Sequence, residues 1–437
     1  MGKTLLKKYI VRRGISVDEI ARQCKISESY ASKIINNRAG IIKSEVLANM
    51  AYYLKLSLPK LDLLRRTYVT EPPRSLSAIA KEGTKIIFQE YLDNVLTSID
   101  EYDQARMDKY HGKIVELKDK SMDIYSAYIA GYDGWRLLLE DKLEGSLECF
   151  KEAQAFNAGN ELEIRLKSQT LSGLGEALIA RGYYRESMKA LRKSLMMRTN
   201  GGKGAGWIYL QMGTLFKRKG DFVQALVAYR KAQAFGDNII GILALSAQSQ
   251  LEPHKDEMFS RQLVTQAFQK VKDSKTLKLK GAIYGSLGES LLGLKAFDNA
   301  ESLFKESIQY SIAEGDLRSK HRAMIGLGNA YVENNEQTLL SEIVHCIKPE
   351  INQEGDSINV WGKLNLLGVY HMKNEEFDTA KAILLEAYRI AQQNKLPLEM
   401  IFSCKRLREC HSALGEADIA DFYGREEKRI RKMIKIR

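Results

Sequence analysis

The first forty residues carry small and apolar side chains at a spacing that fits two short helices crossing at a turn. Ile20 and Ala21 belong to the first of these segments, and Ala31 and Ile34 to the second, with Ile26 between them. Ala31 and Ile34 are three residues apart and therefore share one helix face. Ala21 supplies the small side chain that two closely crossing helices need. We expect two helices joined by a short turn.

Two serines mark the predicted helix starts. Ser16, followed by Glu19, has the pattern of a capping box, in which each side chain accepts from the other's backbone N–H, and Ser27 can cap the second helix. The second helix, expected over 28–37, keeps a polar face, as a helix that reads base edges in a DNA major groove requires. The candidate DNA contacts are Ser27, Glu28, Ser29, Ser32, Lys33, Asn36, Asn37 and Arg38.

The segment 3–67 resembles the helix-turn-helix of the Cro/repressor class. The resemblance implies a five-helix DNA-binding domain over residues 1–69. Its first, fourth and fifth helices would contain Leu5, Leu6 and Ile10, then Val46, Leu47, Met50 and Leu54, then Leu61 and Leu64. One position departs from the class, because Lys25 stands where a turn glycine is usual, and lysine adopts a left-handed conformation only at a cost. A helical hairpin that touches no DNA is the alternative.

A linker and connecting helices are expected next. Pro72 and Pro73 cannot continue a helix, so residues 70–83 read as the linker. Over 84–125 helical periodicity returns, with Ile87, Tyr91, Val95 and Ile99 four residues apart.

From residue 126 onwards small residues recur about every forty positions. Glycines stand at 134, 175, 213, 288, 328 and 368, with weaker copies near Gln248 and Arg408. In four copies a small residue follows the glycine by twelve positions, a bulky one by sixteen, and another small one by nineteen. These sets are Ser187, Leu191, Ser194; Ala225, Tyr229, Ala232; Ala300, Phe304, Ser307; and Ala380, Leu384, Ala387.

The pattern resembles the tetratricopeptide repeat. It implies an all-α protein in which about eight helix pairs over 126–437 stack into a right-handed superhelix with a concave groove. The basic segment 428–437, with Ile430, Met433 and Ile434 on one side, is expected to cap the last repeat. A second contact with DNA or with another anionic surface is the alternative for it.

Charge concentrates at the two ends of the chain. The net charge is +12, and residues 1–70 hold 14 Lys and Arg against 5 Asp and Glu. This basic head is the electrostatic property expected of phosphate contact. The sequence has no long apolar run and no signal-peptide core, so we expect a cytoplasmic protein without a membrane span.

Candidate chemistry is sparse. The glycine-rich segment 200–206 lacks the complete phosphate-loop string and reads as a loop between repeats. The five cysteines and six histidines show no metal-ligand spacing. We therefore expect no enzyme, no metal and no cofactor.

Groove residues follow from the repeat offsets, because the first helix of each tetratricopeptide repeat lines the concave face. The selected positions are Trp207, Gln211, Thr214, Lys217, Arg218, Glu289, Arg322, Asn329, Asn365 and Lys373. Asparagine offers a donor and an acceptor to one peptide unit, and Lys and Arg suit carboxylates. The candidate peptide-binding residues are Gln211, Lys217, Glu289, Arg322, Asn329 and Asn365.

The order of the domains resembles the RNPP family of peptide-pheromone-responsive regulators. It implies a homodimeric, quorum-sensing transcription regulator whose repeats bind a short signalling peptide, with Asn329 and Asn365 as clamps on the peptide backbone. Peptide binding would change the superhelix curvature and so the spacing of the two DNA-binding heads on their operator. Two alternatives stay open, namely a sensor that acts on a protein partner such as a phosphorelay component, and a regulator without a peptide.

Overall fold

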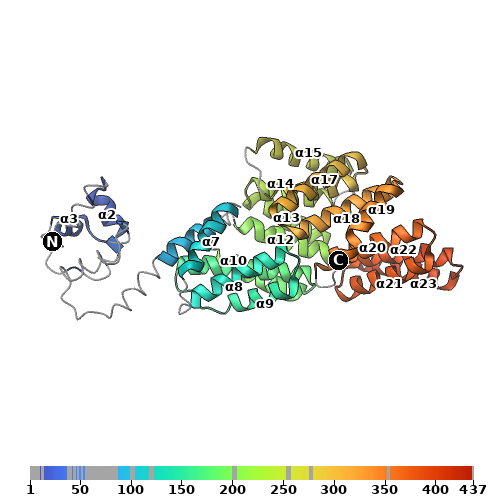
Figure 1. Ribbon diagram of the computed structural model, residues 1–437, viewed down its shortest axis with the longest axis horizontal. Coiled ribbons are helices and arrows are strands. Elements are labelled where there is room, and N and C mark those ends of the chain that lie inside the picture. Colours follow the sequence, from blue (N-terminus) through green and yellow to red (C-terminus); the bar gives the residue numbers. More distant parts are fainter. Residues whose placement is uncertain are drawn as a thin grey trace. The chain divides into compact units, whose positions relative to one another are not determined.

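The structure is a computed structural model. It describes residues 10, 14–36, 42, 46, 49–50, 53–54, 87–98, 104–117, 123–198, 204–251, 257–274, 279–351 and 355–435. Among these residues there are helices and turns and no strand, which confirms the all-α prediction (Figure 1). The chain divides into one compact unit of residues 1–97 and 104–119 and a second of residues 98–103 and 120–437. The predicted linker 70–83 lies outside the described residues.

The first unit contains the two predicted short helices, α2 (Val17–Gln23) and α3 (Glu28–Ile35). Ser16 Oγ accepts from the backbone N–H of Glu19 at 3.1 Å, and Ser27 Oγ accepts from that of Tyr30 at 3.2 Å. The expected reverse half of the capping box differs, because the Glu19 carboxylate accepts from the Tyr53 hydroxyl instead. Both helix starts are therefore fixed by serine caps.

The core of this unit buries the predicted apolar faces. Ile20, Ala21, Ala31 and Ile34 are at most 4% exposed, and Ile10, Cys24, Ile35, Ile42, Val46, Met50 and Leu54 join them. Ile26 packs against the cluster while remaining partly exposed. Lys25 has φ 52°, so the turn adopts the left-handed conformation with lysine in the glycine position. Leu5, Leu6, Leu47, Leu61 and Leu64 lie outside the described residues.

Two further segments of this unit are helical, residues 87–98 and α7 (Gln104–Leu117). The buried stripe of the first consists of Phe88, Leu92, Val95 and Leu96, whereas Ile87 is 37% exposed. The predicted stripe was therefore wrong for Ile87, whereas Val95 is buried as predicted and Ile99 lies outside the described residues. The alternative register places two large side chains, Phe88 and Leu92, in the core, and burial of large apolar groups decides which face turns inward.

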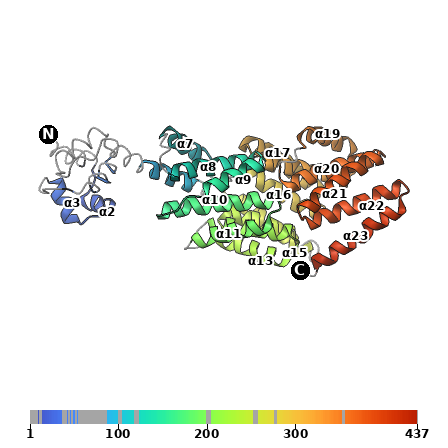
Figure 2. The same ribbon diagram turned by 90° about the horizontal axis from the view of Figure 1, so that it is seen from below.

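The second unit, which we call the repeat unit, is the whole array of helix pairs, one after another along the chain (Figure 1 and Figure 2). Eight successive antiparallel pairs occur in its described part, which confirms the helical-repeat solenoid. They are α8 (Asp123–Leu139) with α9 (Leu143–Ala153), α10 (Glu161–Ala180) with α11 (Tyr184–Met197), α12 (Gly204–Arg218) with α13 (Phe222–Phe235), α14 (Asn238–Ser249) with α15 (Glu257–Asp273), α16 (Lys280–Gly293) with α17 (Phe297–Glu314), α18 (Leu317–Glu333) with α19 (Gln337–Ile347), α20 (Ser357–Lys373) with α21 (Phe377–Gln393), and α22 (Pro397–Ala413) with α23 (Ala417–Lys435). A short 3-10 turn, Lys348–Glu350, follows α19.

The repeat glycines lie where the two helices of a pair cross. A Cβ placed on Gly213 would stand 2.4 Å from the Tyr229 ring, and Gly175, Gly288 and Gly368 meet Leu191, Phe304 and Leu384 in the same way. Each bulky residue is thus the sixteenth after its glycine, as the spacing predicts. The pairs are held by this close approach of small against large side chains.

The two weak copies differ from one another. Near Gln248 the offsets are retained, because Ser260, Val264 and Ala267 are buried. In the last pair the sizes are exchanged, since Arg408 lies on the first helix and packs on Gly424 of the second. The C-terminal helix α23 buries Ile430 against the last repeat and leaves Met433 46% exposed.

Candidate functional site

The candidate DNA contacts that the structure describes lie on the outside of α3. Ser27, Glu28, Ser29, Lys33 and Asn36 are exposed and Ser32 is half-buried. The Asn36 side chain donates to Ser32 Oγ at 3.3 Å, so these two polar groups share one face. Asn37 and Arg38 lie outside the described residues. The arrangement presents hydroxyl, amide and ammonium groups away from an apolar core.

In the second unit, three of the predicted groove residues come together from different repeats. Arg322 of α18 forms an ion pair with Glu289 of α16, and both charges act on Lys217 of α12. Burial lowers the pKa of Lys217 to about 8, and its ammonium group donates to the Gln250 side chain. The nearby Glu289 carboxylate raises the pKa of Arg322. We call Lys217, Glu289, Arg322 and Glu399 the groove cluster.

Glu399 of α22 completes this cluster. Its Oε2 is buried without a hydrogen-bond partner among the described residues. Burial raises the pKa of its carboxyl group, and the charges of Arg218 and Lys217 oppose that shift. The carboxylate is therefore close to two cations but forms no ion pair with either of them in the described part of the chain.

The predicted asparagines differ in their surroundings. Asn365 Oδ1 is buried and has no hydrogen-bond partner in the described region, whereas Asn329 is half-buried. A buried acceptor that no protein group satisfies costs free energy unless a ligand or water supplies the donor. Asn365 is thus the predicted groove residue with open hydrogen-bonding capacity.

Other groove positions are engaged within the protein. Gln211 is 5% exposed, accepts from Ser172 Oγ at 2.8 Å and donates to Glu176 at 2.8 Å, so it is not free for a ligand. Thr214 Oγ1 donates to the Leu210 carbonyl, Lys373 donates to Asn335, and Trp207 packs beside Ala232. A fixed offset from the repeat glycine predicts on which face of the helix a residue lies. It does not predict how deeply that face is buried in the curved array of helices.

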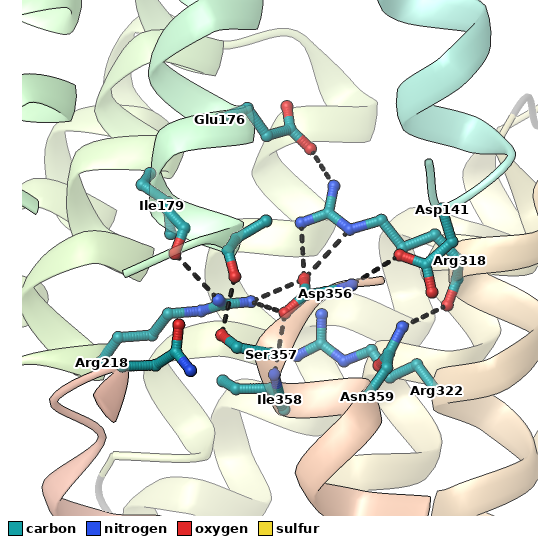
Figure 3. A network of polar contacts seen from close by, with 12 residues as sticks. Asp141, Glu176, Ile179, Arg218, Arg318, Arg322, Asp356, Ser357, Ile358 and Asn359 are labelled. Atoms are coloured by element: carbon teal, nitrogen blue, oxygen red, sulfur yellow. Dashed lines mark hydrogen bonds and ion pairs between the residues drawn. The ribbon is translucent and has the colours of Figure 1, made fainter. Parts of the chain in front are cut away.

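Arg218 takes part in a buried ionic network centred on Asp356 (Figure 3). Its guanidinium group donates to both carboxylate oxygens of Asp356, at 3.1 and 2.9 Å. Arg318 donates to Asp356 Oδ2 from Nε at 3.1 Å and from a terminal nitrogen at 2.9 Å, and pairs with Glu176 at 2.6 Å. The side chains of Arg218 and Asp356 are only 7% and 4% exposed.

The chain positions Asp356 by local structure. It precedes α20 as its N-cap and accepts from the backbone N–H of Ile358 at 3.0 Å, while its own N–H donates to Asp141 Oδ1 at 2.8 Å. Burial alone would raise the pKa of the Asp356 carboxyl, but Arg218 and Arg318 outweigh it and hold the pKa well below its ordinary value. We call Asp141, Glu176, Arg218, Arg318 and Asp356 the Asp356 network.

The network joins repeats that are far apart in the sequence. Asp141 belongs to the first repeat, Glu176 to the second and Arg218 to the third, whereas Arg318 and Asp356 belong to the sixth and seventh. Nearby, the Tyr184 hydroxyl donates to the Asn394 carbonyl at 3.2 Å, and Ser357 Oγ donates to the Ala180 carbonyl at 2.7 Å. The repeat unit is therefore closed by direct contact between its early and late repeats.

Sequence reasoning missed several members of these sites. Glu176 directly follows Gly175, just as Glu289 follows Gly288 and Asn329 follows Gly328, so the same offset in the second repeat would have selected it. Asp356 and Ser357 carry the signature of a helix start. Nothing in the repeat pattern marks Arg318 or Glu399, because their role depends on closure of the array.

Within the described ranges, no group of His, Cys, Asp or Glu side chains could hold a metal ion. None of the helices described is long and apolar enough to cross a membrane.

No protein-family model and no curated protein matches the chain. Similar solved structures include the apo form of the quorum sensor NprR from B. thuringiensis, with 13% identity, 78% of this chain and 98% of that chain covered, and a TM-score of 0.49. PlcR from Bacillus thuringiensis in complex with the peptide PapR7 and DNA has 11% identity, coverages of 74% and 98%, and a TM-score of 0.39. A Rap protein complexed with competence and sporulation factor has 13% identity, coverages of 96% and 99%, and a TM-score of 0.39.

These neighbours include proteins of the RNPP family that the sequence resembles. Their TM-scores are below 0.5, so they say nothing of the function of this chain. Its repeat fold is established by the helix pairs and the glycine contacts described above.

Proposed function

We propose that the chain is a cytoplasmic, peptide-responsive transcription regulator that binds double-stranded DNA through α3. The observation that carries the DNA-binding part is the division of α3 into two faces. Ala31, Ile34 and Ile35 are buried in the core, whereas Ser29, Lys33 and Asn36 are exposed. A short, capped helix with a polar outer face fits the major groove.

Selection of bound duplexes from a random-sequence DNA library by the full chain would test this part. The double variant Ser29→Ala, Lys33→Ala is expected to lose sequence-specific binding and to weaken the salt dependence, with a slope lower by about 1 for the lost lysine. Lys189→Ala, an exposed site on α11, is the matched control. A double variant that keeps its affinity and salt slope would contradict DNA reading by α3.

The repeat unit is proposed to bind a short peptide in its groove. Asn365 Oδ1 supports this proposal, because it is a buried acceptor that a peptide N–H would satisfy. Asn329 lies at the corresponding face of the preceding repeat and offers both a donor and an acceptor. Lys217 and the pair of Arg322 with Glu289 supply charges for the side chains or termini of the peptide.

Calorimetric titration with synthetic peptides encoded by small open reading frames beside the gene tests the groove. Asn365→Ala is expected to weaken binding about tenfold, since one hydrogen bond to a buried acceptor is lost. Asn299→Ala, an exposed site on α17, is the control. If no such peptide binds, a protein partner becomes the better candidate for the groove.

Regulation would follow from closure of the repeat unit. The proposed peptide site and the Asp356 network share two helices. On α12, Lys217 lies beside Arg218, and on α18, Arg322 lies one turn after Arg318. A peptide that prefers one degree of closure shifts the equilibrium between curvatures. In a homodimer this shift would change the spacing of the two DNA-binding heads.

A further inference from the structure

The charged side chains that meet inside the repeat unit can be matched one by one. Arg218 and Arg318 are paired with Asp356 and Glu176, and Arg322 is paired with Glu289. Within the groove cluster and the Asp356 network, Lys217 of the third repeat and Glu399 of the eighth have no opposite charge in contact in the described part of the chain. Their segments are neighbours, because a Cβ placed on Gly220, three residues after Lys217, would stand 3.4 Å from Pro397, two residues before Glu399. The two charges also influence each other's pKa, although they form no ion pair with one another.

Lys217 keeps free donor capacity. An ammonium group has three N–H donors, and the Gln250 side chain accepts one of them. Although burial lowers the pKa of Lys217 to about 8, the group is largely protonated at neutral pH. It can therefore donate to a carboxylate with little movement.

Glu399 keeps free acceptor capacity. Its Oε2 is buried and unpartnered. Burial raises the pKa of the carboxyl group, but a cation in contact with it would favour the ionised form, which has acceptors and no donor. One turn further along α22, Ser403 Oγ accepts from the Trp361 indole N–H at 2.9 Å. One turn after Trp361 on α20 lies Asn365, whose Oδ1 is a second buried acceptor without a partner among the described residues.

Burying two opposite charges without a partner costs free energy unless a ligand pairs with both of them. We infer that Lys217 and Glu399 form a dipolar subsite for a ligand that carries a carboxylate and an ammonium or guanidinium group, with the carboxylate on Lys217 and the cation on Glu399. This inference rests on the proposed peptide function and specifies the chemical class of the peptide. The cation belongs either to a basic side chain or to a free N-terminus, and the carboxylate to an acidic side chain or a C-terminus.

Synthetic peptides of one apolar background provide the test, titrated into the full chain by calorimetry. With both ends blocked, one peptide carries Asp and Lys, one carries Asn and Gln in their place, and two carry a single charge each. A further peptide with Asn and Gln but free ends tests the termini as the source of the charges. The doubly charged peptide is expected to bind about tenfold more tightly than the neutral one, since each satisfied charge contributes a charge-assisted hydrogen bond.

Variants assign the two ends of the dipole. Glu399→Gln should abolish the advantage of the basic residue, and Lys217→Met that of the acidic residue. Glu186→Gln and Lys189→Met, both exposed on α11, are the matched controls and should keep the full preference. A charge preference that persists in both groove variants would overturn the subsite.

The remaining outcomes separate this inference from the proposed function. If neutral and charged peptides bind equally well, the subsite is wrong while peptide binding stands; if none binds, both are overturned. The pKa of Lys217, measured without any peptide, also tests whether Lys217 and Glu399 share a site. Because Glu399 raises the pKa of Lys217, Glu399→Gln should lower the pKa of Lys217 below about 8. The pH dependence of amine modification at Lys217 measures this pKa. An unchanged pKa would show that the two groups do not share a site.

Discussion

Arg218 donates hydrogen bonds to both carboxylate oxygens of Asp356, at 3.1 and 2.9 Å, across a separation of 138 residues. In a solenoid each repeat normally contacts its neighbours alone. Here the end of α12 in the third repeat is bound directly to the start of α20 in the seventh. Together with the Tyr184–Asn394 and Ser357–Ala180 hydrogen bonds, this contact holds the early and late repeats at one curvature.

Neutralising Asp356 should open the repeat unit. Asp356→Asn keeps the shape of the side chain but leaves Arg218 buried without its counter-charge, which is expected to cost about 3 kcal/mol or more in the free energy of unfolding. Chemical denaturation measures that loss, and small-angle scattering should show a larger radius of gyration. Asp298→Asn, an exposed site on α17, should change neither quantity. An unaltered radius with full stability would show that the contact does not hold the array closed.

Lys217 should make the protein more stable as the pH rises above neutrality. Its folded-state pKa is about 8, whereas an unfolded lysine titrates near about 10.4. Between these values the unfolded chain binds more protons, so the free energy of unfolding gains a positive contribution with increasing pH. Lys217→Met should lack this contribution in denaturation curves recorded over that interval, and Lys189→Met should retain it. Parallel pH profiles for wild type and Lys217→Met would contradict the lowered pKa.

A methyl group at a helix crossing should be far more harmful than one on an open face. Gly213→Ala places a Cβ 2.4 Å from the Tyr229 ring, whereas Gly112→Ala on α7 meets no atom within 4 Å. We expect the first to lower the stability of the repeat unit by about 1–3 kcal/mol. The second should raise helix stability by about 0.5–1 kcal/mol, because alanine is the better helix former. Thermal unfolding of both variants measures the two changes in stability. Equal changes would show that the two helices move apart at the crossing at little cost in free energy.

The turn before α3 should gain stability from glycine. Lys25 is held at φ 52°, where a side chain costs about 1 kcal/mol that glycine avoids. Lys25→Gly is therefore expected to stabilise the first unit by about 0.5–1 kcal/mol in denaturant unfolding. Gln23→Gly, an exposed site at the end of α2, should have the opposite sign. Destabilisation by Lys25→Gly would indicate that the lysine side chain makes a contact that offsets its strain.

The repeat glycines show what sequence reasoning can reach. Gly213 and Tyr229 are sixteen residues apart within one helix pair, and such local spacing determines the pair without reference to the rest of the chain. The same reasoning overlooked the turns, in which the seventh residue after the small one is left-handed. That residue is glycine at 182 and 220 but Asp141, Lys295, Asn335 and Glu375 elsewhere, so residue type alone does not reveal the position.

The repeat pattern in the sequence does not predict the Asp356 network. Arg218 was selected for its helix face, yet its burial follows from how the four rotations between the third and the seventh repeat add up. Asp356 lies in a connection that the repeat pattern does not cover. Likewise, Ile87 and Phe88 are both apolar, and the register of the stripe is decided by what packs against it.

The closing contact also fixes the number of repeats. An array held by neighbour contacts tolerates gain or loss of a unit at any junction, and such arrays diverge readily in length. An additional pair between α13 and α18 would carry Asp356, together with Arg318, past Arg218 and leave the buried charge of Arg218 without its partner. Among proteins that share this contact, we therefore expect insertions to fall in the loops or after the eighth pair, and the interval from Arg218 to Asp356 to change little in length.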